Sequence, residues 1–199
     1  WIEENESAWR PWLRDGFYSD EADLTFNGPV NVLTSGIKSS GGTVTFGAGS
    51  NGTSFAEDTG MKLTNTSLVL QTGLDLPYLQ FSGTSLLQTN GNTLSPEIFV
   101  IGVQDELDLT DVATDGNTIL ALSADSSITK TGDLLFNWVS LNGHNLTLNP
   151  DILSLNAVGI SFENSDTSVA STGTLLAQGV DVKFTKKLWV RNGLLEMGG

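Results

Sequence analysis

A short triplet whose first and last residues are apolar recurs through this chain about every twenty residues. The last residues of successive triplets lie 17 to 22 positions apart. The triplets occupy residues 24–26, 44–46, 61–63, 79–81, 98–100, 120–122, 139–141, 160–162 and 182–184. Self-similarity at this period is typical of stacked repeats, in which each unit buries apolar side chains against the next. The repeat therefore constrains the fold more than any other feature of the sequence.

Two more apolar positions follow most triplets, one after five to seven residues and one after roughly ten to thirteen. Three apolar positions in each repeat indicate a coil with three short sides, and pairs such as Asn142-Gly143 supply the turns between them. We therefore predict an all-β fold, a single-stranded parallel β-helix (β-solenoid) of about eight or nine coils over residues 24–199. An antiparallel sandwich is the alternative, but it gives no reason for one spacing to recur. The repeat near residues 47–60 fits worst, and we expect a bulging loop there.

Residues 1–23 do not follow the repeat and are predicted to form a separate N-terminal cap or assembly segment. Trp9, Trp12 and Leu13 would lie on one face of a short helix, because residues three and four apart are neighbours on a helix surface. Pro11 limits this helix to a turn or two, or lies in its first turn. The expected arrangement is a short helical, aromatic segment ahead of the solenoid.

The charge balance and the absence of certain residues exclude several functions. With 23 acidic and 9 basic residues, a net charge of −14, the 199-residue chain does not suit binding to bare nucleic acid or to an anionic membrane surface. No apolar run reaches the length of a membrane span, so membrane insertion is not expected. The absence of cysteine excludes disulfides, thiolate metal sites and a cysteine nucleophile. The chain begins at Trp1 rather than Met, which we interpret as processing after export, with truncation as the alternative.

The rungs of the repeat resemble those of a known class of surface proteins. Residues 139–148, with the sequence VSLNGHNLTL, place an Asn-Gly turn between two short apolar–polar strands. This pattern resembles the rungs of parallel β-helix surface proteins such as autotransporter passengers, two-partner-secretion adhesins and phage tail fibres. The likeness covers residues 24–199. It implies a right-handed parallel coil and an adhesive or scaffolding role outside the cell or at its surface.

Few residues have the pattern of a reactive site. Asp105, Asp108 and Asp111 are candidates for a Ca²⁺ site, because hard cations are bound by several converging oxygen ligands. Their stretch matches neither an EF-hand loop nor a glycine-rich calcium repeat, so solvated surface charge is the alternative. His144, the one histidine, is expected in an exposed turn, with no nucleophile-elbow pattern beside it. We therefore expect a protein that is not an enzyme and has no cofactor other than this candidate Ca²⁺.

The two chain ends differ in charge. Residues 1–25 contain seven acidic and two basic residues, whereas residues 180–199 contain two acidic and four basic ones. This asymmetry predicts head-to-tail association, in which one copy's start meets another copy's last coil. The predicted interface consists of Glu3, Glu4, Glu6, Trp9 and Trp12 at the start, and Lys186, Lys187, Trp189, Arg191 and Leu194 at the end. The alternative is that Gly199 is only the point at which a longer chain was cut.

These expectations combine into a structural role. We expect an extracellular or cell-surface β-solenoid subunit that self-assembles head to tail into a filament, fibre or matrix, or that forms the shaft of an adhesin. The alternative is a carbohydrate-binding or polysaccharide-cleaving β-helix like those of phage fibres, with surface glycans as partners. That alternative predicts a lateral groove with exposed aromatic side chains and converging carboxylates.

Overall fold

The fold is a parallel β-solenoid of about seven turns. The structure is a computed structural model, which describes residues 16–162, 173–189 and 194–196. The chain divides into two compact units, residues 1–96 and 97–199. The all-β parallel fold predicted from the repeat is confirmed. Within the described ranges, no helix has the length and hydrophobicity that crossing a membrane requires.

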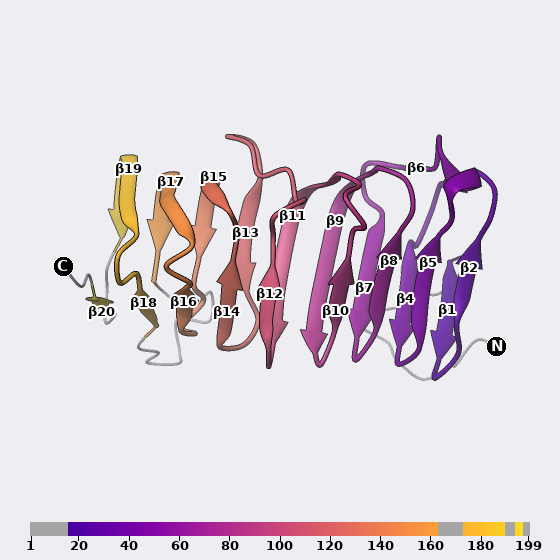
Figure 1. Cartoon of the computed structure of the whole chain (residues 1–199), viewed down its shortest axis with the longest axis horizontal. Coiled ribbons are helices and arrows are strands. Elements are labelled where there is room, and N and C mark those ends of the chain that lie inside the picture. Colours follow the sequence, from indigo (N-terminus) through magenta and orange to yellow (C-terminus); the bar gives the residue numbers. More distant parts are fainter. Residues whose placement is uncertain (1–15, 163–172, 190–193, 197–199) are drawn as a thin grey trace. The chain divides into compact units, whose positions relative to one another are not determined.

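The first unit contains two main parallel sheets and a two-stranded one. Its long sheet has the strand order β1 (Phe17–Asp20), β4 (Ile37–Ser40), β7 (Gly60–Thr64) and β9 (Leu74–Gly83). Its second sheet has the order β2 (Leu24–Phe26), β5 (Thr43–Phe46), β8 (Ser67–Leu70) and β10 (Leu86–Gln88), and the small sheet pairs β3 (Asn31–Val32) with β6 (Ser54–Phe55). In Figure 1, β4, β7 and β9 lie side by side as successive rungs.

The second unit continues the same plan in two sheets. Its long sheet has the order β11 (Leu94–Val103), β13 (Ile119–Leu122), β15 (Gly132–Ser140), β17 (Ile152–Ser161) and β19 (Asp181–Trp189). The other sheet has the order β12 (Glu106–Asp108), β14 (Ser126–Thr129), β16 (Leu146–Leu148), β18 (Thr174–Leu176) and β20 (Leu194–Glu196). The long sheets make three rung-to-rung steps in the first unit and four in the second. The structure has about seven turns, slightly fewer than the predicted eight or nine coils.

The core consists of rows of apolar side chains that stack from rung to rung. Successive side chains of a strand point to opposite faces, so alternate residues enter the coil. In the second unit Leu120, Val139 and Ile160 are partners on neighbouring strands, and none is exposed. In the second sheet of the first unit, the Phe26 and Phe46 rings stack with their centroids 5.0 Å apart. Most of the triplets supply these rows, but residues 98–100 do so in the opposite phase: Phe99, the middle residue, is buried, whereas Ile98 is 39% exposed.

The first two triplets do not lie in the same sheet as the later ones. Residues 24–26 and 44–46 lie in β2 and β5 of the second sheet, whereas residues 61–63 lie in β7 of the long sheet. Met61 stacks on Ile37 of β4, a rung that the triplet pattern missed. Triplets with the same in–out–in alternation occur in both sheets, such as residues 44–46 and 61–63, so the pattern alone cannot tell the sheets apart. The expected bulge after residue 47 is present and contains the 3₁₀ turn η2 (Ala48–Ser50) and β6.

Short polar side chains at the corners join each coil to the next. Asp23 accepts a hydrogen bond from the Thr43 backbone N–H at 2.8 Å, one coil further along the chain. Asn65 accepts one from the Thr84 N–H at 3.1 Å, and its own φ is +51°. Asparagine tolerates this left-handed conformation better than most residues. The corners thus explain why Asn and Asp recur between strands.

The solenoid begins earlier than residue 24. Phe17–Asp20 forms β1, which pairs with β4 in parallel register. The predicted cap of residues 1–23 therefore contains a rung of the solenoid. Trp9, Trp12 and Leu13, on which the short helix was predicted, lie outside the described residues.

Candidate functional site

The last described long rung, β19, differs from the rung beneath it in burial. Six of the ten residues of β17 are buried, whereas no residue of β19 is buried. Phe184 pairs with the buried Ala157, yet its side chain is 43% exposed. Trp189 pairs with Ser161 and is 39% exposed. Apolar side chains at this rung are therefore left uncovered by the strands that the structure describes.

The outer edge of β19 is also open. Among the described strands, β19 pairs with β17 alone and ends the strand order of its sheet. A strand at the edge of a sheet presents a row of backbone N–H and C=O groups that can pair with another chain. The open edge and the exposed aromatic side chains lie on the same strand, so this surface is suited to the addition of a further strand.

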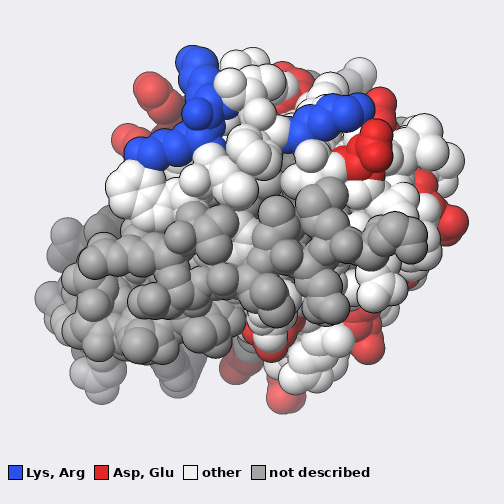
Figure 2. Space-filling model, turned by 90° about the vertical axis from the view of Figure 1, so that its left-hand side faces the viewer, with Lys and Arg blue, Asp and Glu red and all other residues white. Residues whose placement is uncertain are grey.

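Lysine side chains give this rung a positive charge. Lys183, Lys186 and Lys187 are all exposed on β19. The Lys187 ammonium lies 3.8 Å from the Trp189 ring centroid, a cation–π distance. The Lys183 Nζ is 3.5 Å from the Asp181 carboxylate, an exposed ion pair that stabilises little. Figure 2 shows the molecule from the side on which β19 lies in Figure 1. Lysine side chains protrude from the upper part of this view.

The other predicted interface residues are only partly described. Glu3, Glu4, Glu6, Trp9, Trp12 and Arg191 lie outside the described residues. Leu194 lies in β20, where its backbone pairs with Thr174 of β18. The structure adds Phe17 and Tyr18 of β1, which are 42% and 36% exposed. Neither residue was predicted, because residues 1–23 were assigned to the cap; Phe17 and Tyr18, two residues of types common in strands, were the available signal.

The acidic stretch is not assembled into a metal site. Among the described residues, no group of three or more His, Asp or Glu side chains could hold a metal ion. Asp108 ends β12 and accepts hydrogen bonds from the Thr110 N–H and hydroxyl at 2.8 and 2.6 Å. Burial lowers the pKa of Lys130, while the charges of Asp111 and Asp108 oppose that shift. The geometry thus gives Asp105, Asp108 and Asp111 no common point of coordination.

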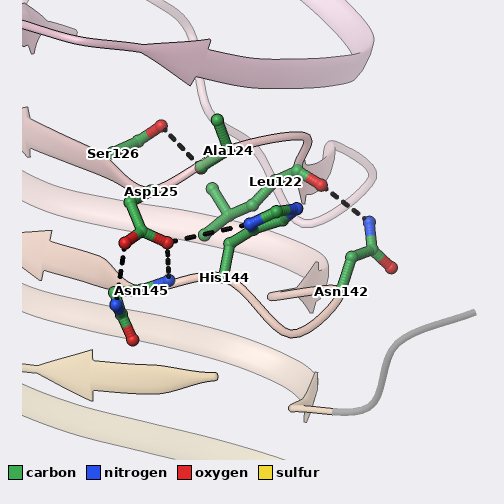
Figure 3. Close-up of polar contacts among 7 residues, drawn as sticks. All are labelled: Leu122, Ala124, Asp125, Ser126, Asn142, His144 and Asn145. Atoms are coloured by element: carbon green, nitrogen blue, oxygen red, sulfur yellow. Dashed lines mark hydrogen bonds and ion pairs between the residues drawn. The ribbon is translucent and has the colours of Figure 1, made fainter. Parts of the chain in front are cut away.

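His144 lies at a corner between two coils, with Asp125 one coil earlier (Figure 3). The Asp125 carboxylate accepts hydrogen bonds from the Asn145 backbone N–H at 2.8 Å and from its amide at 2.9 Å. His144 Nδ1 is 3.7 Å from Asp125, and the Ser126 hydroxyl donates to the Ala124 carbonyl rather than to the histidine. Asp125 therefore has the same corner role as Asp23 and Asn65, and the geometry is not that of a Ser-His-Asp triad.

A shallow groove runs beside this corner. It has a volume of about 460 Å³ and is lined by Gln104, Asp125, Ser126, Ser127, Asn145, Thr147, Thr174 and Leu176. None of these lining residues is aromatic, and Asp125 is the one carboxylate among them. Glycosidases act through a pair of carboxyl groups that flank the bond to be cleaved. The groove therefore lacks the paired carboxylates and aromatic side chains expected for the carbohydrate-cleaving alternative.

No protein-family model, curated protein or solved structure matches this chain. The function must therefore be argued from the surface of the solenoid itself.

Proposed function

We propose that this chain is a structural β-solenoid subunit that joins end to end with other copies of itself, forming a filament, fibre or matrix, or the shaft of an adhesin. The observation that supports this proposal most strongly is the absence of any buried residue on β19, directly above a rung in which six of ten residues are buried. A second copy would supply the missing layer. The proposal places the subunit at the cell surface, because its rungs resemble those of secreted parallel β-helix proteins.

The surface of the first described rung complements that of β19. Phe17 and Tyr18 of β1 are exposed aromatic side chains, as are Phe184 and Trp189 of β19. Asp20, Glu21 and Asp23 are exposed at or near β1 and carry negative charge, opposite to the lysines of β19. Opposite charges guide two surfaces into one orientation and speed their encounter. The proposed contact therefore sets β1 of one copy on β19 of the next.

The proposed contact joins two different surfaces. Because β1 and β19 are not the same patch, a pair of bound copies still presents one free surface of each kind, β1 on one copy and β19 on the other. Heterologous contacts of this type form open chains unless the rotation between copies closes them into a ring. Parallel strand addition would also pair the open edge of β19 through main-chain hydrogen bonds, as in β-augmentation.

Charge reversal tests the proposal. We expect the parent chain to associate in sedimentation velocity in a concentration-dependent way and to form elongated particles in negative-stain electron microscopy. Replacing Lys186 and Lys187 by Glu should weaken this association, since acidic surfaces would then face each other. Lys62→Glu, on β7 and on neither β1 nor β19, is the control and should leave association unchanged.

A complementary variant makes the test specific. Asp20→Lys with Glu21→Lys should also fail to associate alone, because both of its surfaces are then basic. Mixing it with the Lys186→Glu, Lys187→Glu chain should restore association, since each contact again joins opposite charges. A parent chain that stays monomeric at every concentration reached, or a mixture that fails to associate, would contradict the proposal.

A further inference from the structure

Two lysines stand together on the lateral face of the first unit. Within residues 16–96 the basic residues are Lys38 and Lys62 alone, against six carboxylates. Lys38 of β4 and Lys62 of β7 are partners in parallel register, so their Cα atoms are separated by one strand spacing, about 4.8 Å. Burial lowers the pKa of Lys62, and the positive charge of Lys38 lowers it further. The two like charges therefore destabilise each other in the chain as it stands.

Tyrosine rings flank the lysine pair. The Lys38 ammonium lies 5.6 Å from the Tyr18 ring centroid, and the Lys62 ammonium lies 5.6 Å from the Tyr78 ring centroid. The Tyr78 hydroxyl donates a hydrogen bond of 2.8 Å to Gln80 Oε1, which keeps the two N–H donors of that amide for other partners. Tyr18, Lys38, Lys62 and Gln80 are partners on four successive strands, so they form one row across the sheet.

A glycine allows Tyr78 to occupy its place. Gly60 is the partner of Tyr78 on β7, and a Cβ built on Gly60 would lie 2.0 Å from the Tyr78 carbonyl oxygen. Any other residue at position 60 would therefore displace the backbone that holds the tyrosine. The close approach of Gly60 to the Tyr78 backbone therefore fixes where the Tyr78 side chain leaves the sheet.

A row of hydroxyl groups runs beside the lysines. Ser40, Thr64 and Ser82 are partners on β4, β7 and β9, two residues beyond the lysine row and on the same face. The Thr64 and Ser82 hydroxyls are 2.9 Å apart. The outer face of these three strands thus combines two cations, aromatic rings, an amide and hydroxyls; we call it the lysine–tyrosine face (Tyr18, Lys38, Lys62, Tyr78 and Gln80).

We propose that the lysine–tyrosine face binds an acidic oligosaccharide, with Lys38 and Lys62 holding its carboxylate or sulfate groups and with Tyr78 lying against a sugar ring. A ligand anion between the lysines would offset the repulsion between their two positive charges. Tyrosine offers an apolar ring face with a polar tip, which suits a pyranose ring. The amide and hydroxyl groups match the hydroxyls of a sugar.

The same features disfavour a nucleic acid as the ligand. A nucleic acid carries a charge at every phosphate, and the chain's net charge of −14 would repel so dense a polyanion. An acidic oligosaccharide has neutral rings and hydroxyls between its charges. Successive rungs are separated by a distance comparable to the length of one pyranose unit, so neighbouring lysines can contact neighbouring sugars.

Isothermal titration of the full chain with a galacturonate hexamer and with a sulfated hexasaccharide tests the proposal. We expect at least one of the two to bind and the methyl-esterified galacturonate hexamer, which is neutral, to bind at least tenfold more weakly. Lys62→Gln and Lys38→Gln should each weaken binding about tenfold, whereas Lys183→Gln, the same charge change on β19, should change it less than twofold. Tyr78→Phe should bind like the parent within threefold, and Tyr78→Ser should not.

Thermal unfolding of each variant verifies that it is folded, and inorganic sulfate and a single-stranded oligonucleotide serve as further probes. The proposal is overturned if neither acidic hexasaccharide binds or if the methyl ester binds equally well. It is likewise overturned if the lysine variants match Lys183→Gln, or if sulfate or the oligonucleotide binds as tightly as the sugars. Lys62, Tyr78 and Gln80 lie on β7 and β9 rather than on β1 or β19, so the effects of the Lys62 and Tyr78 variants on sugar binding can be measured apart from self-association.

Discussion

The exposed aromatic side chains of β19 allow the strength of the proposed end-to-end contact to be estimated. Phe184 and Trp189 are 43% and 39% exposed. An aromatic residue buries roughly 200 Å² in full, so covering the exposed parts of both would remove about 160 Å² from water. At about 25 cal/mol per Å² this is worth about 4 kcal/mol. Incomplete burial and the ordering of side chains reduce the expected contribution to about 2 kcal/mol.

Replacing both aromatic residues by serine should therefore weaken association about thirtyfold, since each 1.4 kcal/mol changes a dissociation constant about tenfold. Sedimentation equilibrium over a concentration series measures this change directly. Leu135→Ser is the control, because Leu135 is also 43% exposed but lies on β15, away from the edge strand. The control should change the dissociation constant less than threefold.

One result would refute the reasoning behind this estimate. If the Phe184→Ser, Trp189→Ser chain associates as strongly as the parent, the aromatic side chains of β19 are not covered by a second copy. If Leu135→Ser weakened association as much as the double variant, lateral contacts rather than the end-to-end contact would dominate the association. Far-ultraviolet circular dichroism of each variant separates loss of association from loss of fold.

Two further predictions concern the corners of the coil. The Asn142 side chain donates a hydrogen bond to the Leu122 carbonyl at 2.9 Å, and the backbone φ of Asn142 is +48°. Asn142→Ala should therefore reduce the free energy of unfolding, measured by urea titration, by about 1 kcal/mol or more. Asn142→Gly should reduce it less, because glycine adopts a positive φ without strain. Hydrogen bonds from the Asn117 backbone N–H and from Thr118 lower the pKa of Asp115. This carboxylate therefore contributes its stability above the unfolded pKa of about 4, and the contribution disappears as the pH falls through the lower folded pKa. The difference in free energy of unfolding between the parent and Asp115→Ala, measured in urea, should accordingly be largest at pH 7 and become smaller toward pH 2. A difference that stays constant with pH would contradict this prediction.

The triplet repeat was sufficient to predict a solenoid, because a rung is a local unit of strand, turn and strand. The apolar positions of residues 120–122 and 139–141 reach the core through the alternation of side chains within each strand. The same alternation could not place residues 44–46, because both sheets of a coil have it. The thirteen residues after Phe46 shift the next triplet into the long sheet. Only the pairing of Met61 with Ile37 reveals that shift.

The candidate metal site likewise could not be judged from the sequence alone. Asp105, Asp108 and Asp111 are close in sequence, and that density suggested a metal site. In the structure Asp108 accepts hydrogen bonds within its own turn, and no metal-binding group forms in the described part of the chain. Closeness along a strand does not bring side chains to one point, since alternate residues face opposite sides.

The sequence by itself determined the parallel all-β coil, the polar corners and the excess of negative charge. These follow from the period of apolar residues, from turn-forming residues and from composition, all of which are local or additive properties. Only the tertiary structure decided which residues become neighbours one coil apart. Lys38 and Lys62 are separated by 24 positions in the sequence, yet they are partners on adjacent strands. The register of a parallel sheet depends on the length of every intervening loop, so the juxtaposition of charged and aromatic side chains emerges only when the coil is formed.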